Sequence, residues 1–480
     1  MKAGLSVEQE RSAPDGEMYV PTTRAAGCPY CFDPESGALR RALRQRRPDA
    51  ETALPTDRLA DDIGWLHRLL RAQYAGYIDW IRHPHLDVEA FFADWVNGLR
   101  RVGRLCSFRE AVVDPLISLR SAVPDRHLTF WGADPLIDDH EGMAFHEYQA
   151  VVDDASDVPK LEPTDVPGAR PGTWQVRPVL HSGGRIGRIA SLSACTDRGS
   201  LVANHKDGCL RLRRRPPTPP RPRPAQVPVY EWRACGDVTV VTLRSFGGPR
   251  QVQDHLRQFV ADYVHHVARP SVLLDLRGNN GGNLTYIAQW IAQAKGGESR
   301  GVPRLEVALW ACAEWNRTVE AQVREGRVDH PEAQTEREHA WAAWLARPLT
   351  HTLQLSAAIC RGKSDRPYSG RVFALVDRNS GSSGERAAVD LKRELGAILV
   401  GERTAGCMQY GEAVRFVLPQ TGLVVQVPTR RFFFDEDVEC VGFPVDVYLE
   451  DITQSPDDLL PHLDAIERAA HSAQSERRLE

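Results

Sequence analysis

The sequence contains very little lysine. Lysine and arginine together account for 60 of its 480 residues. Lysine itself occupies only Lys2, Lys160, Lys206, Lys295, Lys363 and Lys392. Few positions can therefore supply a lysine that acts as a catalytic base. The formal net charge of -4 and the pI of about 6.5 leave no basic footprint of the kind that binds nucleic acid.

Long hydrophobic runs are also missing. The start, MKAGLSVEQERSAPDGEMYV, has no apolar stretch of signal-peptide length, and no later stretch is long enough to span a bilayer. We therefore expect no membrane partner and a cytoplasmic location. The ten cysteines are scattered, and a reducing compartment keeps them as thiols, so no disulfide framework is expected.

The one close cysteine pair, Cys28 and Cys31 in GCPYCFD, is half of a zinc-knuckle pattern. No second CxxC completes it, so local packing or a flexible terminus is favoured over metal binding. No metal or other cofactor is expected.

The composition, with 42% hydrophobic and 26% charged residues, is typical of a globular protein, and the length predicts two or three folded units. Charged, Gly and Pro positions without periodicity predict an arm at the start, and three- and four-residue spacing of apolar residues predicts helices after it. The segment RLRRRPPTPPRPRPAQVP favours an extended linker over a docking segment for an SH3-like groove or an acidic surface. The predicted units are 1–57, a partly disordered N-terminal arm; 58–130, a helical subdomain; 131–210, a small β-rich module; 211–228, the linker; 229–450, the main core; and 451–480, a C-terminal helix and tail.

After the linker, strand and helix patterns alternate. DVTVVTL, SVLLDL, VFALVD and AILVGE are buried-strand patterns separated by helical ones, which predicts an α/β core with a largely parallel sheet. A helical insertion containing Arg and Trp is expected from about 305 to 350.

Two Gly-rich turns follow buried strands in this core. VFALVDRNSGSSGERAA passes from strand through small residues into a helix, a geometry that exposes a serine oxygen beside backbone N–H groups. Taken alone, a Ser/Gly cluster before a helix is usually an N-cap. The second turn, DLRGNNGGN, can be read as an ordinary strand-to-helix connection, and it lacks the pattern of a nucleotide-phosphate loop.

The two turns, followed by VGERTAGCMQYGE and ECVGFPVDVYLE, resemble the C-terminal processing (tail-specific) peptidases and the tricorn core. The resemblance covers roughly residues 229 to 450 and implies a crotonase- or Clp-like fold and a serine peptidase. It implies that Ser382 is the nucleophile, with the N–H groups of Ser383 and Gly281 in the oxyanion hole. The β-rich module stands where those peptidases carry a PDZ domain.

The base is where the sequence departs from the processing peptidases. Their lysine position is Cys407 here, and Lys392 lies ten residues after the serine along the same helix, about 15 Å away. Cys407 itself has no strand-to-helix elbow and is a weak candidate for the nucleophile.

The tricorn branch uses a histidine instead. PDRHLTF resembles its DxHT signature, which implies that His127 is the base, whereas a lone histidine after a helix is more often structural. Glu439, 57 residues beyond Ser382 (439 − 382), matches the glutamate that orients the histidine, although it can also be a surface charge.

The predicted function is cleavage of a peptide or protein substrate through an acyl-enzyme. VPTRRFF is expected to be a strand edge that a substrate peptide can extend. Two alternatives remain open: a non-catalytic module that binds an apolar ligand or a peptide on the same fold, and an acyltransferase or macrocyclase. The sequence does not determine the oligomeric state.

Overall fold

The computed structural model describes residues 48–130, 133, 146–152, 174–194, 198–205, 208–216, 228–300, 302, 304–307, 351–354, 358–362, 367–418, 420–434 and 438–479. Cys28 and Cys31, the arm up to residue 47, nearly all of the expected insertion and most of the linker lie outside these residues. No helix in the described part is both long enough and apolar enough to cross a membrane.

The region from 48 to 130 is helical, as its apolar spacing predicts. Its elements are β1 (Ala53–Pro55), α2 (Thr56–Gln73), α3 (Tyr77–Arg82), α4 (Val88–Val102), β2 (Leu105–Ser107), the π-turn η1 (Arg109–Val113), α5 (Asp114–Ala122) and β3 (Thr129–Phe130). In α4, the Asp87 side chain caps the first turn by accepting from Ala90 N at 3.0 Å, and Gly103 ends the helix. Its buried residues Phe92, Trp95 and Leu99 form one apolar stripe.

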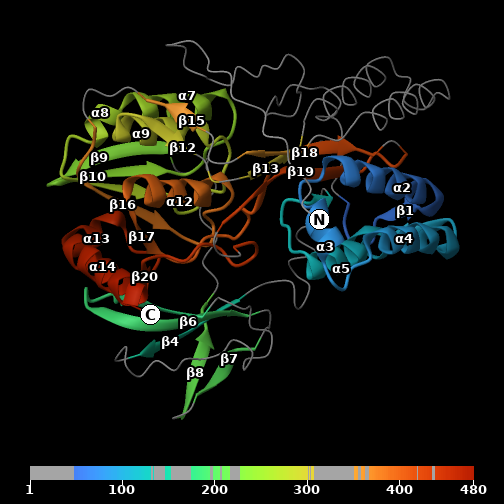
Figure 1. Cartoon of the computed structure of the whole chain (residues 1–480), viewed down its shortest axis with the longest axis horizontal. Coiled ribbons are helices and arrows are strands. Elements are labelled where there is room, and N and C mark those ends of the chain that lie inside the picture. Colours follow the sequence, from blue (N-terminus) through green and yellow to red (C-terminus); the bar gives the residue numbers. More distant parts are fainter. Residues whose placement is uncertain are drawn as a thin grey trace, which may run out of the picture.

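Helix α2 packs between α4 and a hairpin that comes much later in the sequence. The hairpin consists of β18 (Tyr410–Val417) and β19 (Val424–Phe432), and it reaches across to the helices in Figure 1. Tyr410, Leu418, Val425 and Val427 share one apolar core with the helices. The N-terminal region is therefore fixed to the core by hydrophobic packing.

An 11-stranded sheet forms the centre of the described structure, in the order β7-β8-β4-β6-β5-β20-β17-β16-β11-β10-β9. Its parallel strands are β10 (Val238–Leu243), β11 (Ser271–Asp275), β16 (Arg371–Val376), β17 (Ile398–Gly401), β20 (Val447–Leu449) and β5 (Gln175–Leu180). Antiparallel β9 (Tyr230–Cys235) closes one end. The predicted α/β core with a largely parallel sheet is confirmed.

Helices cover both faces of this sheet. One face packs on α7 (Arg250–Ala261), α9 (Thr285–Lys295) and α12 (Ser383–Leu395), near the short α8 (Tyr263–His266). The other face packs on α14 (Leu463–Leu479), which follows α13 (Pro456–Leu459) and η5 (Leu460–His462). Successive residues of β11 alternate between these two cores, so the strand is buried on both sides.

The β-rich module continues the same sheet. Its antiparallel strands are β4 (His146–Val152), β6 (Ile186–Ala194), β7 (Ser200–His205) and β8 (Gly208–Arg214), and it joins the core where β5 pairs with β20 through Val179 and Tyr448. Strand β8 includes residues 211–214, which we had expected in the linker. Figure 1 shows the module below the core, with the helical region to one side.

Smaller strands surround the hairpin and helix α9. They are β12 (Glu298–Arg300), β13 (Arg304–Val307), β14 (His351–Gln354) and β15 (Ala358–Arg361). Strand β19 pairs with β18 along one side and with β13 and β3 along the other. The expectation that VPTRRFF forms a free edge was therefore wrong, because β18 pairs along one side of it and β13 pairs with residues 430–432 on the other. Strand β18 lies at the end of this sheet among the described strands.

Candidate active site

Ser382 lies in a strained turn between a buried strand and a helix. Strand β16 ends at Val376, and Ser382 immediately precedes α12 with φ 50° and ψ -121°. A residue with a Cβ rarely adopts this conformation, and strained backbone of this kind gathers at functional sites. It is also the geometry of a nucleophile elbow, which exposes the serine side chain at a helix N-terminus.

The turn after β11 packs directly against this elbow. A Cβ placed on Gly281 would lie 2.9 Å from Ser382 Cβ and 2.9 Å from Ser383 N, so only glycine fits there. Ser383 Oγ donates to Gly282 O at 2.6 Å, and Gly381 N donates to Asn279 O at 2.9 Å. The structure thus brings Gly281 and Ser383 together beside Ser382.

Gly281 N–H is engaged locally, because it donates to Asn279 Oδ1 at 3.0 Å. Asn279 itself is fully buried, and its Nδ2 donates to Leu243 O at 3.2 Å. The Asn279 amide therefore fixes the shape of the turn that presents Gly281 to the elbow.

Glu385, in the first turn of α12, connects the elbow to the turn formed by residues 404–407. Its buried carboxylate accepts from Ser382 N at 3.1 Å, Cys407 N at 2.7 Å, Gly406 N at 3.0 Å and Thr404 Oγ1 at 2.6 Å. Burial raises the pKa of Glu385, and these hydrogen bonds oppose that rise. Sequence reasoning assigned no role to this glutamate.

Cys407 lies where the processing peptidases carry their lysine. Its Sγ accepts the Ser382 N–H at 3.2 Å. Burial, and then the charge of Glu385, raise the pKa of the thiol well above its ordinary value. A thiol held protonated in this way is a poor nucleophile.

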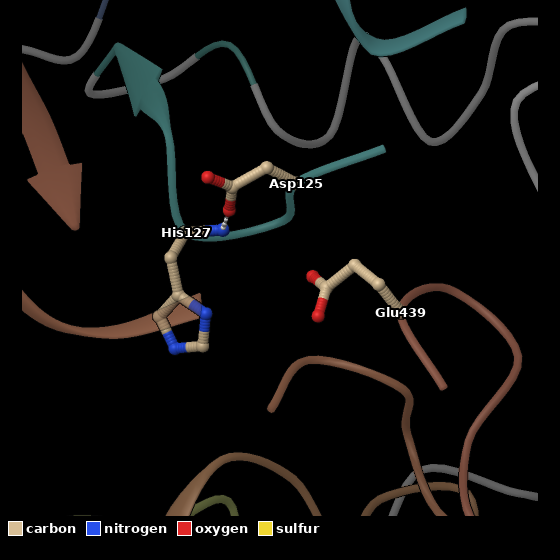
Figure 2. Close-up of side chains that lie close together, drawn as sticks. All are labelled: Asp125, His127 and Glu439. Atoms are coloured by element: carbon tan, nitrogen blue, oxygen red, sulfur yellow. Dashed lines mark hydrogen bonds between the residues drawn. The ribbon is translucent and has the colours of Figure 1, made fainter. Parts of the chain in front are cut away.

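His127 and Glu439 are far apart in the sequence but lie close together in the structure. One ring nitrogen of His127 and one carboxylate oxygen of Glu439 are within 4.8 Å of each other, and Figure 2 shows the imidazole next to this carboxylate. The buried Glu439 carboxylate accepts from Arg126 N at 2.9 Å, Met408 N at 3.1 Å and Gln409 N at 2.9 Å. Glu439 is therefore buried and firmly held, unlike a surface charge.

Asp125 is a second acidic residue beside His127, and sequence reasoning missed it. It is buried, and its Oδ1 accepts from His127 N at 2.7 Å, the bond drawn in Figure 2, and from Leu128 N at 3.1 Å. Its Oδ2 accepts the Tyr74 hydroxyl at 2.8 Å. The signal was the aspartate two residues before the histidine, because aspartate at that spacing commonly bonds the backbone of the following turn.

The turn at 404–409 connects the two groups of residues. Arg126 Nη1 donates to Ala405 O at 3.2 Å, Ala405 N donates to Ser380 O at 2.9 Å, and Cys407 Sγ accepts from Ser382 N. On the other side, Gln426 Nε2 donates to His127 O at 3.1 Å, and β3 pairs with β19 just after the histidine. His127 is thus held on a segment that contacts the 404–409 turn, and that turn contacts the serine elbow.

Among the described residues, Asp125, His127 and Glu439 also have a spacing that suits a metal ion. However, five backbone N–H groups donate to the two carboxylates. The two carboxylates therefore act as hydrogen-bond acceptors. They hold the backbone of residues 126–128 and 408–409, and these bonds fix the orientation of their oxygens.

The core of the chain is similar to a known peptidase family. The model of peptidase family S41 matches residues 237–446. No curated protein matches the sequence. Mature CPAF complexed with lactacystin is a similar solved structure, at 13% identity over 86% of this chain and 98% of that one, with a TM-score of 0.43.

Two further solved structures are similar. The photosystem II D1 C-terminal processing protease is 14% identical over 85% of this chain and 97% of its own, with a TM-score of 0.37. The tricorn protease is 14% identical over 87% of this chain and 37% of its own, with a TM-score of 0.37. The core of this chain, residues 237–446, therefore resembles peptidase family S41, and this match supports a serine peptidase.

Proposed function

We propose that the chain cleaves peptide bonds through an acyl-enzyme on Ser382, with His127 as the general base and Glu439 as the residue that orients the histidine. His127 takes the proton of Ser382 Oγ while the oxygen attacks the peptide carbonyl. The imidazolium then gives that proton to the leaving amine. Water, activated by the same histidine, releases the acyl group and restores the serine.

The observation that carries this proposal is the backbone of Ser382. Its positive φ at the start of a 13-residue helix presents the hydroxyl where the N-terminal end of the helix favours a developing negative charge. The adjacent Ser383 N–H is the first oxyanion donor that we propose. Gly281 N–H is the second, and it would have to be shared between Asn279 Oδ1 and the incoming oxygen.

Lysine is poorly placed to act as the base among the described residues. Lys392 Nζ donates to Asp446 Oδ1 at 2.6 Å, and Lys295 is paired with Glu394. Both therefore act in ion pairs. His127 remains the candidate base because its segment is fixed at two points. The Arg126 side chain donates to Ala405 O, and Asp125 accepts the His127 N–H.

Labelling with a fluorophosphonate, followed by peptide mapping, tests this function directly. The reagent should attach to Ser382, and Ser382→Ala should lose both labelling and peptide turnover. Ser475→Ala, which removes an exposed hydroxyl on α14, serves as the matched control and should keep both. Attachment elsewhere, or turnover by Ser382→Ala, would refute the assignment and favour a binding module.

A further inference from the structure

Two buried carboxylates face His127 together. Asp125 and Glu439 are each about 1% exposed, and one oxygen of each lies within 4.8 Å of the other and of a histidine nitrogen. Figure 2 shows both carboxylates near His127, with Asp125 at the His127 backbone and Glu439 to the side of the imidazole ring. Two negative charges this close in a buried place repel each other strongly. Such pairs commonly hold one proton between them.

Within the described part of the chain, neutral groups donate hydrogen bonds to this pair. They include the N–H groups of residues 126–128, 408 and 409 and the Tyr74 hydroxyl. These neutral donors orient the two carboxylates without adding a full positive charge beside them.

Charged and titratable groups surround the pair from several elements. Arg120, from α5, acts on Asp125 and favours its charged form, whereas Glu385, from α12, opposes the charge of Glu439. Arg126 and Cys407 lie on the two adjoining turns, and Tyr74 lies at the end of α2. Burial raises the pKa of Asp125 to about 6. Burial and then the charge of Asp125 raise that of Glu439 well above its ordinary value.

We propose that Asp125 is a positioning residue that forms a carboxyl pair with Glu439, and that the pair holds a single proton at neutral pH and fixes His127 for its work on Ser382. This proposal rests on the proposed function of Ser382 and His127. The pair then carries one negative charge, the charge that an imidazolium needs beside it.

The proton count stays balanced through the reaction. The proton that leaves Ser382 Oγ goes to His127, and the carboxyl pair keeps its own proton and its single charge. His127 later passes its proton to the leaving amine, and the pair is again unchanged. Asp125 also fixes the backbone at His127 through its bonds to residues 127 and 128, so the ring and its charge partner are held together.

Infrared spectroscopy of the intact chain at pH 7 tests the pair without requiring turnover. The wild type should show the C=O stretch of a buried protonated carboxyl, and Asp125→Asn should lose it, because Glu439 ionises once its charged neighbour is gone. Glu439→Gln should lose it as well. Asp62→Asn, which alters a buried carboxyl in α2, should keep it. If the band persists in Asp125→Asn, burial alone holds the proton on Glu439 and the pair is refuted.

Kinetics supply the second readout. Asp125→Asn should lower kcat by about 10²-fold through misplacement of His127, with KM nearly unchanged and with melting close to that of wild type. An unchanged kcat would overturn the positioning role.

If Asp125→Asn does not fold, isotope labels on the aspartate carboxyls of the wild type replace the variant. If Asp125 and Glu439 share the proton, labelling the aspartate carboxyls should shift the C=O band. A band that does not shift refutes sharing. Failure of the proposed function is distinguished separately, by the fluorophosphonate label on wild-type Ser382.

Discussion

The backbone N–H of Arg126 donates to Glu439 Oε1 at 2.9 Å, although 313 residues separate them. This bond joins the last turn of the helical region to the loop before β20. The residue beside the proposed base therefore contacts the residue proposed to orient that base.

His127→Gln should lower kcat by about 10²- to 10⁴-fold, because the variant cannot take the serine proton. Steady-state cleavage of a fluorogenic peptide measures this effect. His85→Gln, a change at an exposed histidine in the same subdomain, is the matched control and should keep full activity. Full activity in His127→Gln would leave Ser382 without this base.

Gly281→Ala should lower kcat by about 10²- to 10³-fold, because a Cβ there would lie 2.9 Å from Ser383 N and cover the proposed oxyanion donor. Gly103→Ala is a closely matched control. Gly103 has φ 107° against 105° for Gly281, but nothing lies within 4 Å of its added Cβ. Both variants should lose stability through backbone strain, and only Gly281→Ala should lose activity. Equal activity losses would contradict a role at the site.

Ser382→Gly should be more stable than Ser382→Ala, by about 1 kcal/mol in the free energy of unfolding. Both lack the hydroxyl, but alanine keeps the strain of φ 50°, whereas glycine relieves it at the cost of a more flexible unfolded chain. Urea denaturation of the two inactive variants measures the difference. An alanine variant of equal or greater stability would show that the elbow stores little strain.

Cys407→Ala should keep most of the peptide turnover, and iodoacetamide at pH 7 should leave Cys407 unmodified. Its thiol is held protonated by burial and by Glu385, so it reacts slowly. Mass spectrometry after alkylation gives the extent of modification. Loss of turnover in a folded Cys407→Ala variant would return the thiol to consideration as a reacting group.

Asp62 should make wild-type stability depend on pH between about 4 and 6. Its buried carboxylate accepts from Gln420 N and Thr421 N, and burial raises its pKa from 3.8 to about 6. An acid with a raised pKa contributes stability below pH 3.8, and this contribution is lost as the pH rises through about 6. The loss amounts to about 3 kcal/mol.

Asp62→Asn cannot ionise, so the stability difference between wild type and variant should shift in favour of the variant across that window. Urea denaturation at several pH values measures it. A difference that stays constant between pH 4 and 7 would contradict the assignment.

Local patterns in the sequence predicted the elbow well. The apolar run before Asp377, the small residues around Ser382 and the helical pattern after them lie within one short segment, so their order alone specifies strand, turn and helix. The same reasoning located the Gly281 turn, because adjacent glycines after a buried strand favour a tight connection.

Contacts between distant segments were harder to predict. Asp125 and Glu439 are 314 residues apart (439 − 125), and no local pattern in either segment predicts their contact; only the family resemblance related Glu439 to His127. Strand β20 has only three residues, too few for a periodic pattern, so its pairing with β5 was not foreseen. Likewise, the alternation of side-chain types in β19 predicts a strand, but it does not specify which strands pair with it.

The late position of β20 and Glu439 has a consequence for synthesis. Val179 of β5 can pair with Tyr448 of β20 only after 269 further residues have been synthesised (448 − 179). Until then the module cannot join the sheet. The Arg126 N–H likewise cannot donate to Glu439 until residue 439 has been synthesised. Because chains emerge from the ribosome N-terminal end first, a nascent chain carries its proposed serine and histidine well before the partner that holds the histidine. Newly made chains should therefore gain peptidase activity only after Glu439 and β20 have been synthesised.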